Sequence, residues 1–175
     1  MYEIRIHSRG GQGGVTAARL LADAAFRGGK YATASPFYGA ERRGAPVVSF
    51  VRIDDRPIKV YSQIQHPDMV VVLDPSIMEA VDIFQGLKSE GEILLNSSHP
   101  ITFEGYRTHC VDLTGIAIAR TLVVAGSPVV NTPLLGALAK VGIISLDAAR
   151  AAIRGMFSDN RNVQAAEDAY GELVL

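Results

Sequence analysis

Apolar positions at the start of the chain change from a strand-like to a helix-like spacing on either side of a run of glycines. Residues 3–7, EIRIH, alternate between polar and apolar side chains, which predicts a β-strand. Apolar residues then recur at helical spacing over residues 15–25, and the glycine pair 28–29 predicts the end of that helix. Residues 31–34, YATA, suit a short second strand, so we expect an opening βαβ unit with a right-handed crossover.

The middle of the chain carries the other predicted strands. Residues 47–61, VVSFVRI-DDR-PIKVY, predict an antiparallel hairpin with a tight turn. The apolar run at 69–74, MVVVLD, is typical of a strand buried on both faces of a parallel sheet. Residues 75–87 predict a helix with Pro75 near its start. Two more strands are predicted at EILLN (92–96) and YRTHCVDL (106–113).

The last third of the chain has helical spacing. The predicted helices cover residues 114–123, 132–141, 145–157 and 162–173. Thr114, Asn131 and Ser145 are their expected N-terminal caps. We therefore expect one domain over residues 1–175, with an α/β fold of three layers (α/β/α). Its sheet is expected to be mostly parallel, with the antiparallel hairpin at about 47–61 and a Rossmann-like start.

Composition restricts the class of protein. The chain has 175 residues, of which 48% are hydrophobic and 20% charged, as in an ordinary globular domain. We find no apolar run of about 18 residues that could span a membrane. The first residues do not resemble a signal peptide, so we expect a cytoplasmic protein. The net charge is −1, so the chain lacks the domain-wide basic excess that would predict a nucleic-acid partner.

Cysteine and histidine usage points away from a metal site. Cys110 is the only cysteine, which excludes an internal disulfide, a four-cysteine zinc site and a self-contained iron–sulfur cluster. Its apolar-flanked setting, RTHCVDL, predicts a buried structural thiol. The four histidines follow no metal-binding spacing: they are His7, His66, His99 and His109.

Charge is unevenly distributed along the chain. Residues 1–60 contain ten Lys and Arg against five Asp and Glu, whereas residues 61–175 contain seven against thirteen. The basic part includes the glycine run and the sequence ERRG. This asymmetry favours an anionic ligand or an acidic partner near that part of the chain, although it also suits a solvated surface.

The glycine run, SRGGQGGVT, resembles a nucleotide-binding loop but departs from the known ones. Gly11 and Gly13 match the first two glycines of the Rossmann fingerprint, but Thr16 occupies the third position and YATASPF lacks the acid that binds a ribose. The Gly-Lys-Ser/Thr of a Walker A loop is also missing. Three interpretations stay open for Gly11, Gln12, Gly13 and Gly14: a tight turn, an anion site at a helix N-terminus, or a subunit contact.

A second polar segment, YGAERRG, lies at residues 38–44. Arg42 or Arg43 could pair with Glu41, or Arg43 could present its guanidinium to a phosphate or carboxylate; an exposed polar loop is the alternative. The sequence contains no recognisable nucleophile, catalytic carboxylate pair or Schiff-base lysine. We therefore predict no catalytic residue in this chain, which favours a non-catalytic subunit.

Four segments together resemble the γ subunits of 2-oxoacid:acceptor oxidoreductases, of which the pyruvate:ferredoxin enzymes are an example. They are RGGQGGVTAARLLADAA, SPFYGAERRGAPVVSFVRI, DMVVVLDPSIME and NTPLLGALAKVG, and the closing RNVQAAEDAYGE resembles the family's last helix. YGAERRGAPV is closest to the pyruvate type, because Ala40 replaces the proline usual in the other types. Branched-chain 2-oxoacids and phenylglyoxylate stay open as substrates.

The resemblance implies a complex that converts a 2-oxoacid and coenzyme A into an acyl-CoA, CO2 and reduced ferredoxin or another acceptor. It places thiamine diphosphate with Mg in the α and β subunits and [4Fe-4S] clusters in the β and δ subunits, and none of them in this chain. It leaves the γ subunit a role in assembly, and we expect Arg42, Arg43 and the 10–14 loop to contact a phosphate of coenzyme A or a subunit interface. The alternative is a stand-alone Rossmann-like domain that binds a nucleotide or another small molecule.

Overall fold

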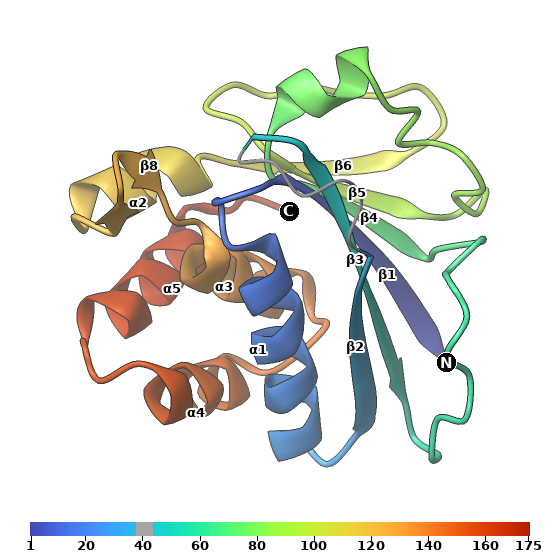
Figure 1. The fold of residues 1–175 in the computed structure, drawn as a ribbon, viewed down its shortest axis with the longest axis horizontal. Coiled ribbons are helices and arrows are strands. Elements are labelled where there is room, and N and C mark those ends of the chain that lie inside the picture. Colours follow the sequence, from blue (N-terminus) through green and yellow to red (C-terminus); the bar gives the residue numbers. More distant parts are fainter. Residues whose placement is uncertain (38–43) are drawn as a thin grey trace.

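The computed structural model describes residues 1–37 and 44–175. Its centre is a six-stranded sheet in the order β2-β3-β1-β4-β5-β6 (Figure 1). The strands are β1 (Tyr2–Arg9), β2 (Tyr31–Phe37), β3 (Pro46–Asp54), β4 (Met69–Val72), β5 (Glu92–Asn96) and β6 (Arg107–Val111). A separate two-stranded sheet joins β7 (Val123–Val124) to β8 (Ser127–Pro128).

Strand direction confirms the predicted α/β class with a mostly parallel sheet. β1, β4, β5 and β6 pair in parallel, and only β3 runs against its neighbours, β1 and β2. The hairpin predicted at residues 47–61 is wrong in its second arm, because residues 57–61 form no strand. Each strand has two hydrogen-bonding edges, and both edges of β3 are already paired, so the antiparallel partners of this segment come from earlier in the chain.

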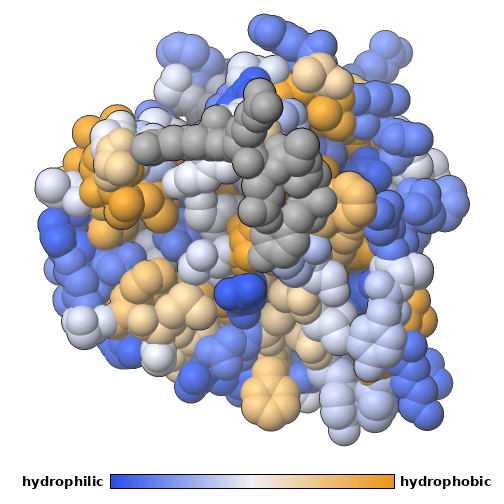
Figure 2. Space-filling model, viewed as in Figure 1, coloured by the Kyte–Doolittle hydropathy of each residue, from blue (hydrophilic) through white to orange (hydrophobic). Residues whose placement is uncertain are grey.

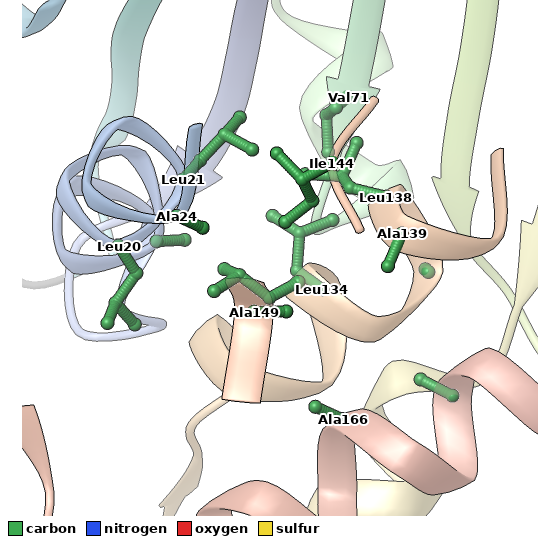
Figure 3. Packing of buried hydrophobic residues seen from close by; sticks show 14 of the residues in the cluster. Leu20, Leu21, Ala24, Val71, Leu134, Leu138, Ala139, Ile144, Ala149 and Ala166 are labelled. Carbon is green, nitrogen blue, oxygen red and sulfur yellow. The ribbon is translucent and has the colours of Figure 1, made fainter. Parts of the chain in front are cut away.

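Helices cover one face of the sheet, as Figure 1 shows. They are α1 (Gly14–Arg27), α2 (Leu113–Ala119), α3 (Asn131–Val141), α4 (Leu146–Met156) and α5 (Arg161–Glu172). Leu21 of α1, Leu134 and Leu138 of α3, and Val71 of β4 meet in the main hydrophobic core beneath the sheet (Figure 3). Among the described helices, none has the length and apolar character needed to cross a membrane.

The opposite face is covered mainly by irregular segments, so the described residues form a regular α-helical layer on one face of the sheet, whereas the predicted three layers (α/β/α) place one on each face. The helix predicted at residues 75–87 is reduced to the short 3-10 helix η1 (Pro75–Glu79). The Asp82 carboxylate accepts a hydrogen bond from the amide of Phe84, which closes a turn, and Gly86 has a φ of 72°, so a regular helix does not continue. Apolar side chains in this segment still cover the sheet: Ile83 and Leu87 pack with residues of β4 and β5.

The observed helix N-termini can be compared with the three predicted caps. Ser145 Oγ accepts from the Ala148 amide, which confirms the cap of α4. The cap of α2 is Asp112, which accepts from the Gly115 amide at 2.7 Å, so the prediction of Thr114 is wrong. Asn131 is likewise the first residue of α3 and not its cap.

Candidate functional site

A cavity of about 860 Å³ opens at the carboxyl ends of the parallel strands. Its lining combines residues that follow β1, β4, β5 and β6 with residues of α2 and β8. The chain leaves β1 toward β2 and β3 on one side, whereas β4, β5 and β6 extend on the other. Open α/β sheets bind ligands at such a switch point, so this position is a candidate site on geometry alone.

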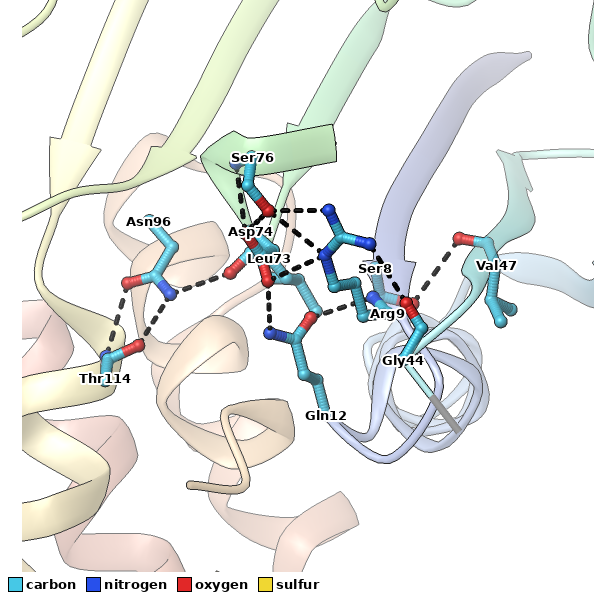
Figure 4. A network of polar contacts seen from close by, with 10 residues as sticks. All are labelled: Ser8, Arg9, Gln12, Gly44, Val47, Leu73, Asp74, Ser76, Asn96 and Thr114. Carbon is cyan, nitrogen blue, oxygen red and sulfur yellow. Dashed lines mark hydrogen bonds and ion pairs between the residues drawn. The ribbon is translucent and has the colours of Figure 1, made fainter. Parts of the chain in front are cut away.

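Arg9, the last residue of β1, connects this strand to the segment that follows β4 at the switch point (Figure 4). Its Nε lies 3.2 Å from Asp74 Oδ2, and its Nη2 donates to Ser76 Oγ at 2.7 Å. Its Nη1 donates to the carbonyl oxygen of Gly44 at 3.0 Å. The Ser76 hydroxyl donates in turn to Asp74 Oδ1 at 2.6 Å, so the guanidinium and the carboxylate are both bound within the cavity wall.

Gln12, at the middle of the glycine run, ties the loop to this pair. Its Oε1 accepts from the Arg9 amide at 2.8 Å, and its Nε2 donates to Asp74 Oδ2 at 3.1 Å (Figure 4). Its backbone carbonyl accepts from the Val130 amide at 3.2 Å. One residue therefore holds the ends of β1 and β4 and the segment before α3 in a single arrangement.

The other side of the cavity is built on Asn96, at the end of β5. Its Nδ2 donates to the Leu73 carbonyl and to Thr114 Oγ1, both at 2.8 Å, and its Oδ1 accepts from the Thr114 amide at 3.2 Å (Figure 4). Asn96 is buried, so these bonds satisfy groups that water does not reach. They fix α2 against the strand ends.

Charge in the described lining is nearly balanced. Burial alone would raise the pKa of Asp74, but hydrogen bonds from the Ser76 hydroxyl and amide, with the Arg9 charge, outweigh it and hold that pKa below its usual value. Among the described lining residues, the charged ones are Arg9, Asp74 and Asp112. The cavity wall is therefore polar rather than strongly basic.

The predicted loop residues have different surroundings, since Gly11 is exposed and Gly14 is buried. Gln12 lines the cavity, whereas Gly11, Gly13 and Gly14 are not among its described lining residues. Gly11 has a φ of 99° with open space around it, and Gly13 has a φ of 88° beside Asn131. A side chain on Gly14 would overlap Ser8, so this glycine permits the close approach of α1 to β1. Arg42 and Arg43 lie outside the described residues.

The sequence reading missed Arg9, Asp74, Asn96 and Thr114. A usable signal was present, because Asp74 and Asn96 each end an apolar strand segment, and parallel strands place their carboxyl ends along one edge. Their hydrogen-bond partners depend on which strands are neighbours, which the local pattern does not specify. The polar residues at the strand ends therefore indicated the edge of the sheet where the site lies, but they did not predict the hydrogen bonds formed there.

Cys110 was predicted to be buried, and this prediction is wrong, because part of the side chain is accessible. Its Sγ lies 3.3 Å from the Ile101 amide and 3.4 Å from the Ile101 carbonyl oxygen, and the side chain is half-buried. Within the described ranges, no three or more His, Cys, Asp or Glu side chains are grouped so that they could hold a metal ion.

Comparison with known proteins gives matches over almost the whole chain. The profile of the pyruvate ferredoxin/flavodoxin oxidoreductase family matches residues 3–172. Pyruvate synthase subunit PorC of Methanothermobacter marburgensis is 48% identical over 177 residues, covering 99% of this chain and 98% of that protein. The pyruvate/ketoisovalerate oxidoreductases common subunit gamma of Thermococcus kodakarensis is 46% identical, covering 100% and 98%.

A solved structure has the same architecture. The crystal structure of pyruvate oxidoreductase subunit PORC from Thermotoga maritima superposes with a TM-score of 0.84 at 36% identity, covering 99% of this chain and 97% of that one. The six-stranded sheet and its helical layer are therefore shared with that subunit.

Proposed function

Because this chain belongs to the pyruvate ferredoxin/flavodoxin oxidoreductase family, we propose that it is the γ subunit of a 2-oxoacid:acceptor oxidoreductase complex. In this proposal the complex converts a 2-oxoacid and coenzyme A into an acyl-CoA, CO2 and a reduced acceptor such as ferredoxin. The proposal is carried by the match to this family over residues 3–172, together with relatives named as a PorC subunit and a common subunit gamma that cover 99% and 100% of this chain.

Pyruvate is the proposed substrate of the complex. Support comes from the names of the two relatives, a pyruvate synthase subunit and a subunit common to pyruvate and ketoisovalerate oxidoreductases. A subunit that serves two oxidoreductases is not the part that chooses between their 2-oxoacids. We therefore assign substrate selection to the partner subunits. A complex that acts on branched-chain 2-oxoacids or phenylglyoxylate would differ in those subunits rather than in this one.

The chemistry is assigned to the α, β and δ partner subunits. In this proposal thiamine diphosphate with Mg, held by those partner subunits, would supply the nucleophilic chemistry at the 2-oxoacid, and their [4Fe-4S] clusters would carry the electrons. This chain's own residues suit a different role: Arg9, Asp74 and Gln12 are engaged with one another and shape a wall. Cys110 is its one thiol, and its sulfur is already engaged with the Ile101 backbone.

We also propose that this chain contacts coenzyme A. The described lining suits the uncharged pantetheine arm, because it alternates amide and hydroxyl groups with apolar ones: Asn96, Ser97, Ser98, Thr114, Ile118, Pro128 and Val130. It suits the phosphates poorly, because its single Arg9 is paired with Asp74. We therefore assign the phosphate contact to Arg42 and Arg43, which follow β2 in the sequence, or assign these arginines to the subunit interface beside it.

The first test is co-purification of the tagged chain from its source cells. We expect a complex of three or four chain types that contains iron–sulfur clusters and thiamine diphosphate. A colourless monomer that binds NAD would contradict the proposal and favour a stand-alone Rossmann-like domain.

The second test addresses coenzyme A with Arg43→Ala in the assembled complex. We expect a higher Michaelis constant for coenzyme A and an unchanged one for the 2-oxoacid. Arg154→Ala, which removes an exposed arginine from α4, is the matched control. A low yield of assembled complex would favour the interface role, and no change in either property would contradict both.

A further inference from the structure

A second, smaller cavity of about 200 Å³ opens on the face of the sheet opposite the helices. Side chains alternate between the two faces of a strand, so Arg5 and His7 of β1 point to this side while Ile4 and Ile6 enter the helical core. Phe37, at the end of β2, lines its rim and is 49% exposed.

Arg5 brings a buried positive charge to this cavity, being only 8% exposed. Its Nη2 donates to the carbonyl oxygens of Ile83 and Gln85, both at 2.8 Å, and its Nε donates to His7 Nε2 at 3.1 Å. Within the described residues no carboxylate forms an ion pair with Arg5, although the exposed Asp82 also lines the cavity. The guanidinium is hydrogen-bonded, but its charge is not neutralised by contact.

His7 brings a hydrogen-bond donor that has no partner among the described residues. Because Nε2 accepts from Arg5, the proton of the neutral ring is on Nδ1, and Nδ1 is buried without a hydrogen-bond partner in the described part of the chain. Burial, with the nearby Arg5 charge, lowers the pKa of His7 to about 4, so the ring is neutral at pH 7. An unpaired buried donor destabilises the folded chain, and a suitable acceptor would remove that cost.

We propose that this cavity receives the carboxylate of an Asp or Glu side chain from a partner subunit, with His7 Nδ1 as its donor and Arg5 as its counter-charge. The inference rests on the proposed function, since it requires a partner chain. A carboxylate supplies an acceptor for the His7 N–H and a negative charge in contact with Arg5, which in the described cavity has only the longer-range charge of Asp82.

Cavity size and donor number favour a side chain over a free acid. The cavity is smaller than the roughly 300–1,000 Å³ typical of pockets for drug-sized ligands. It presents one unpaired buried donor, which binds a free acid weakly, whereas a carboxylate carried by a docked subunit arrives at a high effective concentration. The exposed Phe37 at the rim and the apolar Val48 and Phe50 beside it offer that subunit an apolar contact.

The test compares variants in the complex assembled with its partner subunits. His7→Phe removes the donor, and His7→Gln can replace both the donor and the acceptor for Arg5. We expect His7→Phe to raise the dissociation constant of this subunit about tenfold or more, and His7→Gln to restore most of the affinity. Ser49→Ala is the matched control, because Ser49 Oγ is also buried without a partner but shares the helical face with Ile6.

A second measurement covers the case in which His7→Phe does not fold. Hydrogen–deuterium exchange at the C2 position of His7, followed against pH in the wild-type protein, should show a higher His7 pKa in the complex than in the free chain. Cryo-electron microscopy of the complex should place a partner carboxylate at hydrogen-bond distance from Nδ1.

Three results would overturn the inference. One is an unchanged dissociation constant in a folded His7→Phe variant, and another is an unchanged His7 pKa on assembly. The third is a shift of the His7 resonances by acetate in the free chain together with an empty cavity in the complex, which would assign the site to a free acid. Failure of any partner subunit to co-purify would instead overturn the proposed function and, with it, this inference.

Discussion

Gln12 Nε2 donates to Asp74 Oδ2 across 3.1 Å, and this bond joins the glycine run after β1 to the carboxyl end of β4. The same Asp74 oxygen lies 3.2 Å from Arg9 Nε. The side chain of Gln12, at the centre of the glycine run, therefore holds the run against the end of β4.

Gln12→Ala should lower the free energy of unfolding by about 1–2 kcal/mol, because two side-chain hydrogen bonds are lost and Asp74 is partly buried. Urea denaturation with an unchanged m-value measures this difference. Gln63→Ala, at an exposed position, is the control and should have little effect. Equal stability of the two variants would show that the Gln12 side chain does not hold the loop.

Gly14→Ala and Gly11→Ala separate overlap from backbone strain. An added Cβ at Gly14 would lie 2.7 Å from Ser8 Cβ, so we expect a loss of about 1–3 kcal/mol, part of which Ser8→Gly should restore. Gly11 has open space but a φ of 99°, so Gly11→Ala should cost about 1 kcal/mol, and Ser8→Gly should not restore it. Rescue of both variants by Ser8→Gly would contradict this distinction.

His7→Gln should reduce the acid sensitivity of the free chain. The pKa of His7 is lowered from 6.5 to about 4 on folding, so as the pH falls through this window the unfolded chain gains a proton that the folded chain does not. The stability that neutral His7 contributes is therefore complete above pH 6.5 and is lost toward pH 4. The wild-type protein should lose stability relative to the variant between pH 7 and pH 5.

Urea denaturation at both pH values measures the effect of His7→Gln. His99→Gln, at an exposed position, is the control. Parallel loss of stability in the wild-type protein and in His7→Gln would contradict the prediction.

Gly136→Ala should destabilise the contact between α3 and α5. A Cβ at Gly136 would lie 2.6 Å from the carbonyl carbon of Ala166, and backbone cannot give way as a flexible side chain can. We expect a loss of about 2 kcal/mol or more, measured as a lower thermal midpoint. Gly171→Ala on α5, where a Cβ meets no neighbour, should leave the midpoint unchanged or raise it.

Much of the fold was predictable because its signals are local. The alternation in β1, the apolar run of β4 and the helical spacing of α1, α3, α4 and α5 each depend on residues close in sequence. Ser145 was found as a cap for the same reason, since its bond reaches only to Ala148. The family resemblance then rested on segments spread along the chain, and the match to residues 3–172 confirms it.

Two of the predictions that failed concern groups whose partners are distant in sequence. Residues 57–61 have a strand-like pattern, but β1 and β2 already occupy both edges of β3. Thr114 was expected to cap α2, yet it bonds to Asn96, while Asp112 is the cap. In each case a competing partner was available only once the chain had folded.

By itself, the sequence determined the fold class and the glycine-rich connection between β1 and α1, because short-range periodicity and residue type are sufficient for these. The family came from the resemblance of several segments to known γ subunits. The tertiary structure decided which strands are neighbours, and so brought Arg9, Gln12 and Asp74 together at one edge. It also left the His7 N–H unpaired beside the buried charge of Arg5. Burial and long-range hydrogen bonds depend on the packed chain as a whole, and no local pattern specifies them.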